Sequence, residues 1–257
     1  GANGVVVITT KQGGKKGGKA TVTFDAYVGF KKLSKTLDVL SPYEYVKLDY
    51  ERNLYLLEEG TDAWTEALNV FEENYGKYAD IEKNYLGKEG VNWQNETLGR
   101  TALQQNYRIG VQGGNKALGY KLSYSYFDEE GAMVYSGKQK HNISLNLKSE
   151  VKDWLKLTAN FSFDQRKVYG MGTSENGDRF NKMQHILQYR PTMGIKGTNE
   201  ELIGHVVDPM IDDSGNVMRN PLVSAREETK DRQFRTFNAN AGAVITLAKG
   251  LTFSNTT

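Results

Sequence analysis

Seven segments of the chain alternate apolar and polar residues, which is the pattern of a β-strand with one apolar face. In residues 21–30, Val22, Phe24, Ala26 and Val28 alternate with Thr, Asp, Tyr and Gly. Several segments approach the ~9–11 residues that a tilted strand needs to cross a bilayer. The pattern therefore predicts an antiparallel sheet. The other six segments are residues 107–112, 120–126, 143–148, 155–164, 237–247 and 251–253.

The predicted strands are joined by connections of alternating length. Residues 113–117, 151–154 and 248–250 are short turns, whereas residues 31–106 and 167–235 are very long connections. A soluble sandwich has no reason to place every short turn at one end. Outer-membrane barrels have short turns on one side of the membrane and longer loops on the other. The asymmetry therefore predicts a transmembrane β-barrel.

Aromatic residues lie where the membrane interfaces are expected. Phe30, Tyr126, Phe127 and Tyr169 fall at the loop ends of their strands, and Trp154 lies at a short turn. Such positions are typical of the aromatic girdles of membrane barrels. The alternative is that Tyr and Phe are simply common in strands.

The long connections contain predicted helices. Ser41-Pro42-Tyr43-Glu44 has the form of a capping box with proline at the first helical position, and an apolar stripe follows it up to Gly60. A second helix is predicted after Thr61, with Trp64 on its apolar face. A third, short helix should end before residues 190–191. We expect the apolar stripes of the first two helices to need a partner surface, so that the loop 41–85 is a candidate lid or partner contact.

Composition excludes several classes of protein. Lys and Arg number 33 against 31 Asp and Glu, so the formal charge is +2, which is too small for a dedicated nucleic-acid binder. The basic stretch 11–19 lacks interleaved aromatics and is interpreted as a flexible linker. Cysteine is absent, which removes disulfides and thiolate sites. No apolar run approaches the ~20 residues of a membrane-spanning helix.

Residues that could carry catalysis or bind metal are present but not in productive patterns. His141, His185 and His205 have no partner at helical spacing, so we interpret them as surface or girdle residues and not as a zinc site. Residues 212–216 lack the acidic spacing of a calcium loop and are predicted to form a hairpin turn. Neither a Gly-x-Ser-x-Gly elbow nor a pair of carboxylates at glycosidase spacing is found. We therefore expect no enzyme activity, no metal and no cofactor.

The first ten residues of the chain form a specific motif, Gly-Ala-Asn-Gly-Val-Val-Val-Ile-Thr-Thr. It closely resembles the segment that closes the plug domain in TonB-linked outer-membrane transporters of the SusC/RagA type. Further elements follow in the order of that family: the Gly/Lys-rich stretch 13–19, the helix start 40–45, the segment 92–94, the turn 111–115 and the hairpin 126–131. Asn92 departs from the aspartate usual in the family, which affects at most a local cap and not the assignment. The plug-closing motif consists of Gly1, Ala2, Asn3, Gly4, Val5, Val6, Val7, Ile8, Thr9 and Thr10.

The resemblance implies an all-β fold. The chain is expected to be an internal piece of a longer protein: residues 1–12 end the plug domain, residues 13–19 are a linker, and residues 20–257 form the first part of an antiparallel transmembrane barrel. About seven of roughly 22 strands would be present, with helical insertions in the loops 31–106 and 167–235.

The resemblance also implies a function. The family imports nutrients across the outer membrane of Gram-negative bacteria, with a SusD-like lipoprotein as lid and the TonB complex as energy source, and it performs no chemistry on its ligand. Glycan oligosaccharides are the expected substrates and peptides the alternative. The rival interpretation is a soluble or surface-exposed β-domain for carbohydrate binding or adhesion. Trp64, Trp93 and Tyr169 are the weak candidates for ligand contact, because a sugar ring stacks on a flat apolar face.

Overall fold

The computed structural model describes residues 18–115, 117–170, 182–192, 207–211 and 217–256. The plug-closing motif 1–10, most of the linker 13–19, His205 and the turn 212–216 lie outside the described residues. The expected domain boundaries therefore stay predictions.

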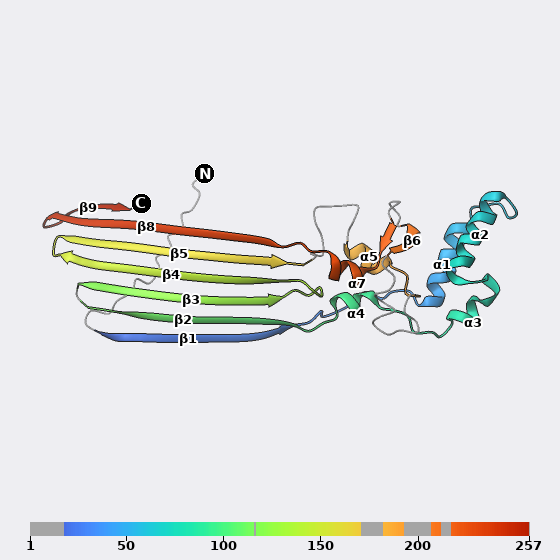
Figure 1. The fold of residues 1–257 in the computed structure, drawn as a ribbon, viewed down its shortest axis with the longest axis horizontal. Coiled ribbons are helices and arrows are strands. Elements are labelled where there is room, and N and C mark those ends of the chain that lie inside the picture. The colour runs from blue at the N-terminus through green and yellow to red at the C-terminus, as the bar shows by residue number, and fades with distance from the viewer. Residues whose placement is uncertain (1–17, 116, 171–181, 193–206, 212–216, 257) are drawn as a thin grey trace.

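The predicted antiparallel sheet is confirmed. All seven predicted strands pair in one open sheet of order β1-β2-β3-β4-β5-β8-β9, and every neighbouring pair is antiparallel. The strands run along the long axis of the molecule, and the helices lie beyond one end of the sheet (Figure 1). The strands are β1 Gly18–Lys31, β2 Ala102–Gly114, β3 Leu118–Glu130, β4 Gly137–Lys152, β5 Leu155–Tyr169, β8 Arg232–Ala248 and β9 Leu251–Thr256.

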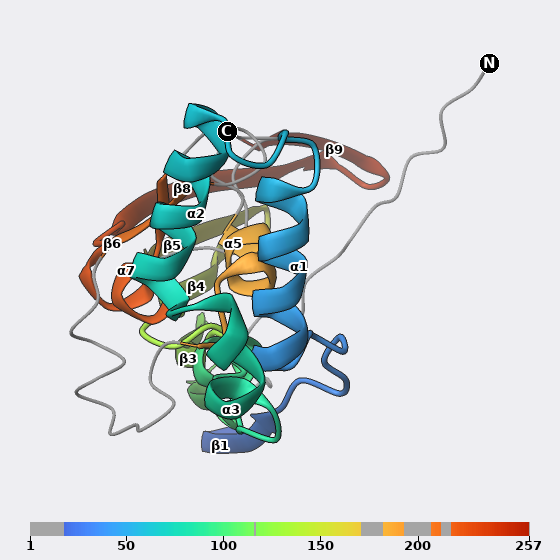
Figure 2. The ribbon, with the colours of Figure 1, turned by 90° about the vertical axis from the view of Figure 1, so that its right-hand side faces the viewer.

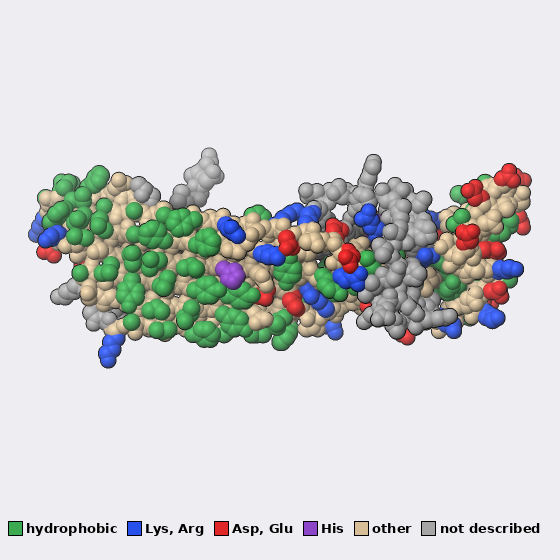
Figure 3. All heavy atoms as spheres, viewed as in Figure 1, with side chains coloured by type: hydrophobic (Ala, Val, Ile, Leu, Met, Phe, Trp, Pro, Cys, Tyr) green, Lys and Arg blue, Asp and Glu red, His purple; other side chains and the backbone are tan. Residues whose placement is uncertain are grey.

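The register gives the sheet one apolar and one polar face. Val111 faces Leu122 across β2 and β3, and Leu145 faces Phe161 across β4 and β5, on the same side of the sheet. Many side chains on this face are exposed to solvent in the described part of the chain; Phe24, for example, is 66% exposed. Figure 3 shows hydrophobic side chains spread over the strands. The opposite face carries hydroxyls, amides and charges, as predicted.

Polar cross-strand contacts mark the second face of the sheet. The hydroxyls of Ser123 and Ser144 lie 2.7 Å apart, and Lys140 Nζ lies 2.9 Å from Asp164 Oδ2. Exposed pairs of this kind contribute little energy each. These contacts identify the face of the sheet that is suited to contact with water.

The short turns all lie at the end of the sheet away from the helices (Figure 1). In the β2–β3 turn, the Asn115 side chain accepts hydrogen bonds from the backbone N–H groups of Ala117 and Leu118. The β8–β9 turn places Gly250 at φ 83°, a conformation that favours glycine. The predicted separation of short turns from long loops is therefore confirmed.

The long connections form a helical lobe. Two long helices stand side by side in it, α1 and α2 (Figure 2). Within the described ranges, no helix is long and apolar enough to cross a membrane. The lobe elements are α1 Pro42–Leu54, α2 Asp62–Tyr75, the 3₁₀ helix η1 Tyr78–Asp80, α3 Ile81–Tyr85, α4 Trp93–Leu98, α5 Lys182–Gln188, β6 Val207–Ile211, β7 Val217–Arg219 and α7 Pro221–Glu227.

The apolar stripes of α1 and α2 find the partner surface that they were expected to need within the lobe itself, and the role of the loop 41–85 as a lid or partner contact stays a prediction. The two helices and α3 bury these stripes against one another in a distal cluster. Tyr50 packs edge-on against Phe71 with ring centres 5.1 Å apart. The stripes stabilise the lobe from within. The buried members of the distal cluster are Val46, Leu54, Phe71, Tyr75 and Ile81.

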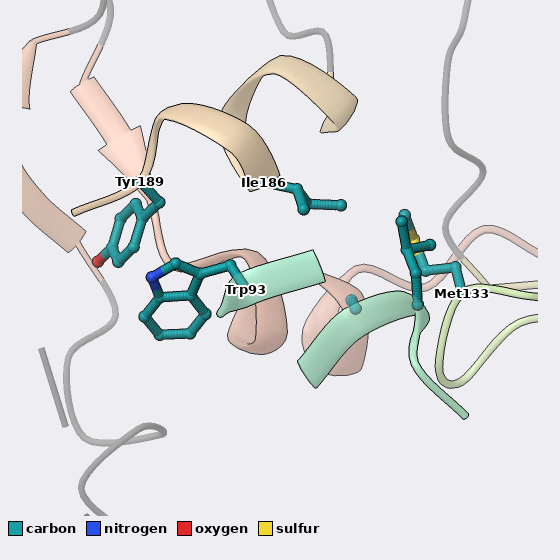
Figure 4. Close-up of a cluster of buried hydrophobic side chains, with 6 residues drawn as sticks. Trp93, Met133, Ile186 and Tyr189 are labelled. Atoms are coloured by element: carbon teal, nitrogen blue, oxygen red, sulfur yellow. The ribbon is translucent and has the colours of Figure 1, made fainter. Parts of the chain in front are cut away.

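A proximal cluster joins the lobe to the sheet. It brings together α4, α5, α7 and the β3–β4 connection, which Arg100 ties down by donating to the carbonyls of Gly131 and Ser136. Figure 4 shows the side chains of this cluster. Its buried members are Trp93, Leu98, Met133, Ile186, Tyr189 and Ala225.

Three details of the lobe differ from the sequence-based expectations. His185 is only 6% exposed within α5, so its interpretation as a surface or girdle residue is wrong. The short helices α4 and α7 were not expected. Each begins at an asparagine cap, Asn92 and Asn220, whose side chain accepts two backbone N–H bonds.

Candidate functional site

A groove of about 630 Å³ opens between α1, α4, α5 and the segment that precedes α1. We call it the α1 groove. Its wall carries Leu37, Val39, Leu40 and Leu48, each between 40% and 61% exposed. The volume lies within the range of small-molecule sites, which are mostly apolar with a few polar groups. The α1 groove is therefore the candidate binding site of the described chain.

One face of α1 supplies both charge and apolar surface to the groove. Glu44, Leu48 and Arg52 follow at a spacing of four residues and all line it. The Ser41 hydroxyl donates to Glu44 Oε2 at 2.7 Å, and the Ser41 backbone N–H donates to it at 2.9 Å. These bonds lower the pKa of Glu44, the side-chain bond contributing most. Glu44 is therefore anionic at neutral pH.

The opposite wall is held by a glutamine clamp. The buried Gln94 side chain accepts from the Leu37 N–H at 2.9 Å and donates to the Leu37 carbonyl at 2.8 Å. Asp38, which follows Leu37, adds a second carboxylate to the groove. Because the side-chain amide of Gln94 makes both hydrogen bonds to the backbone of Leu37, the extended segment that precedes α1 keeps a fixed position beside α4.

The floor of the groove is tied to both clusters. Trp93 and Tyr189 pack edge to face at 5.0 Å, and Trp93 Nε1 donates to the Arg190 carbonyl at 3.1 Å. Arg190 Nη1 donates to Asn74 Oδ1, and its guanidinium lies 5.9 Å from the Tyr75 ring centre. Arg190 therefore connects the proximal and distal clusters behind the groove.

Burial also affects the chemistry of this region. The Tyr75 hydroxyl is buried, which is the main reason that its pKa is raised, and the nearby Asp49 carboxylate raises it further. The phenol therefore stays neutral under physiological conditions. Across the described ranges, no three His, Asp or Glu side chains gather closely enough to hold a metal ion.

The three predicted contact residues lie in different places. Trp93 lines the α1 groove but is only 3% exposed. Trp64 packs against the distal cluster. Tyr169 ends β5, where Lys167 Nζ lies 5.9 Å from its ring centre. The structure does not bring them into one site, and their role in ligand contact stays a prediction.

The groove residues outside this set were missed by sequence reasoning. Leu37, Val39 and Leu40 form a short apolar run directly before the capping box, and this run was the available signal. Arg52 carried no signal, because a single arginine on an exposed helix face is ordinary.

The chain is similar to known receptors. It is 32% identical over 163 residues, 63% of this chain and 14% of that protein, to the TonB-dependent receptor SusC of Bacteroides thetaiotaomicron. It is 22% identical over 262 residues, all of this chain and 22% of that protein, to the TonB-dependent receptor P3 of Formosa agariphila. The chain thus spans 14% to 22% of the length of these curated relatives. No protein-family model matches it.

Solved structures share the fold. The structure of the RagAB peptide transporter matches 95% of this chain and 28% of that chain with a TM-score of 0.64 and 21% identity. The RagAB peptide importer in its open-open state matches with a TM-score of 0.63 and 21% identity, over the same 95% and 28% of the two chains. The open sheet and its lobe therefore have the fold of part of that chain, a partial β-barrel.

Proposed function

We propose that this chain, which belongs to the SusC/RagA-type TonB-dependent receptors, is part of an active importer of nutrient oligomers in the outer membrane of a Gram-negative bacterium. The observation that carries the proposal is the amphipathic seven-stranded sheet with a helical lobe at one end, matched over 95% of the chain to RagAB. The apolar face would contact lipid and the polar face the lumen. Residues 1–12 would end the plug, residues 13–19 link it, and residues 20–257 begin the barrel.

The energy source and the partner protein are inferred from membership of the family. The TonB complex would act through parts of the protein outside this chain, drawing on the proton-motive force. A SusD-like lipoprotein would cover the outer surface, where the helical lobe lies. Family membership supports both partners, and the ligand would pass unchanged.

Two substrate classes remain. Glycan oligosaccharides are the expectation from the sequence resemblance. Peptides are the second candidate, supported by the similarity to the RagAB peptide importer and by the aliphatic wall of the α1 groove. A sugar site usually offers an open aromatic face, whereas Trp93 in this groove is buried.

Uptake by cells tests the proposal. Cells that depend on the full-length protein are given labelled oligosaccharide and oligopeptide mixtures, with and without a protonophore. We expect accumulation of one class that stops with the protonophore and in the gene deletion. Equal accumulation in the deletion strain would contradict the importer and favour the alternative of a surface β-domain.

A further inference from the structure

We infer that the polar face of the sheet carries an anion-binding site at its lobe end, and that its ligand is an acidic oligosaccharide with carboxylate or sulfate groups. The site consists of Phe127, Lys140, Arg166 and Phe234, and we call it the cation row. The inference rests on the proposed function, because the polar face meets the ligand only if it lines a lumen. It deepens that function by assigning a charge to the ligand.

The four side chains of the cation row stand next to one another across four strands. Phe127 of β3 is the register partner of Lys140 of β4, and Lys140 is in turn the partner of Arg166 of β5. Arg166 is the partner of Phe234 of β8. All four lie within three residues of the strand ends that meet the helical lobe (Figure 1). Because neighbouring strands lie about 4.7–4.9 Å apart, the row is about 14–15 Å long.

The pairing of Lys140 with Arg166 is unfavourable for the fold. Like charges directly opposite each other in a sheet are destabilising. Asp164 lies 2.9 Å from Lys140 and neutralises it, whereas Arg166 has no hydrogen bond or ion pair in the part of the chain that the structure describes. The guanidinium of Arg166 is therefore available to an anionic ligand, and such a ligand would offset the repulsion.

The neighbours of the row add positive charge. Lys138 lies two residues before Lys140 and so on the same face of β4. Glu129 is shared between Lys31 and Lys138, whose Nζ lies 3.8 Å from it. One carboxylate therefore meets two ammonium groups, and the row and these neighbours together hold more positive than negative charge. A surplus of this kind attracts anions.

The phenyl rings favour a sugar as the carrier of the anionic groups. Phe234 is 45% exposed, although it lies on the polar face. The Arg166 guanidinium lies 4.5 Å from the centre of this ring, and Lys138 Nζ lies 5.1 Å from the centre of the Phe127 ring. Cation–π attraction holds each cation beside its ring. A flat apolar face next to a charged donor suits a sugar ring that bears a carboxylate, whereas aspartate and glutamate side chains offer no ring to stack.

Calorimetry with the purified full-length transporter tests the inference. The probes are trigalacturonate, which combines sugar rings with carboxylates, maltotriose, which has sugar rings without carboxylates, and a glutamate trimer, which has carboxylates without sugar rings. We expect trigalacturonate to bind about tenfold more tightly than either of the others. Its affinity should fall as salt is raised, because salt screens exposed charges. Equal affinity for maltotriose or for the glutamate trimer would overturn the inference.

The Arg166→Gln variant tests the cation. It should weaken trigalacturonate binding about tenfold without lowering the melting temperature of the protein, because it also removes a like-charge pair. Arg235→Gln is the matched control. Arg235 follows Phe234 by one residue and so lies on the apolar face, where its guanidinium donates to Gln233. The control removes the same charge at the same end of the sheet and should leave the affinity unchanged.

The Phe234→Leu variant tests the ring. It keeps an apolar side chain but removes the flat face, so trigalacturonate should bind about fivefold more weakly. The salt dependence of binding should stay the same, because every charge of the row remains. Unchanged affinity in this variant would overturn the assignment of a sugar as the ligand.

The outcomes separate the inference from the proposed function. Losses of affinity of equal size in Arg166→Gln and Arg235→Gln would overturn the inference, as would a transporter that imports neutral oligomers and does not bind trigalacturonate. Binding that depends on Arg166 in a protein that imports nothing would support the site and contradict the importer.

Discussion

At the scale of single residues, contacts between residues close in the sequence were predictable, and contacts between residues far apart in it were not. The capping box of Ser41 and Glu44 could be recognised because both partners lie within one turn, and its two reciprocal bonds are present. The clamp between Gln94 and Leu37 joins residues 57 positions apart. No local pattern marks such a pair, since it forms only after the lobe has packed.

Removal of the cap should loosen the start of α1. Ser41→Ala deletes the hydroxyl that accepts from the Glu44 N–H, and we expect a cost of about 0.5–2 kcal/mol. Hydrogen exchange at the first turn of α1 in the full-length protein measures it. Ser34→Ala, at an exposed position before the helix, is the control, and equal acceleration by both variants would contradict the cap.

The hydrogen bond of the Trp93 indole N–H should stabilise the lobe in addition to the packing of the ring. Trp93→Phe keeps an aromatic ring against Tyr189 but leaves the Arg190 carbonyl without this donor, at a cost of about 1–3 kcal/mol. Exchange protection in α4 and α5 should fall. Trp154→Phe, at a short turn where Trp154 is 53% exposed, should change little. No loss of protection in the Trp93 variant would show that the bond is not stabilising.

At the scale of elements, periodicity located the strands but not their ends. The strand predicted at 107–112 runs over Ala102–Gly114, because Gln104, Gln105 and Asn106 put polar side chains on both faces and so break the alternation, while the ladder continues to pair. The short helices α4 and α7 were missed for a related reason. Helices of 6 and 7 residues show too few turns for a period to be seen.

The two faces of one strand should respond oppositely to charge. Phe161 lies on the apolar face and Asn160 on the polar face of β5. Phe161→Lys should cost about 2–4 kcal/mol if it lies near the bilayer midplane, while Asn160→Lys should be tolerated. Folding of the full-length protein into liposomes measures both. Equal losses would contradict the assignment of faces.

At the scale of the whole molecule, the segregation of turns and loops was predictable, whereas the groove was not. Chain connectivity alone places the short turns opposite the lobe. The groove combines residues 37–40, 44–52, 91–94 and 186–191, which meet because the two clusters are joined through Arg190. The distal cluster also shows why a stripe cannot be assigned to an external partner from sequence. Two amphipathic helices in one loop can satisfy each other.

Sidedness of labelling tests the central claim, that this chain is a membrane-barrel wall with its lobe outside the cell. The chain contains no cysteine, so single cysteines can be introduced at Leu56, which is 87% exposed in the lobe, and at Lys249 in the β8–β9 turn. In intact cells, a membrane-impermeant maleimide should label Leu56→Cys and reach Lys249→Cys only after the outer membrane is permeabilised. Equal labelling of both positions in intact cells would contradict the account.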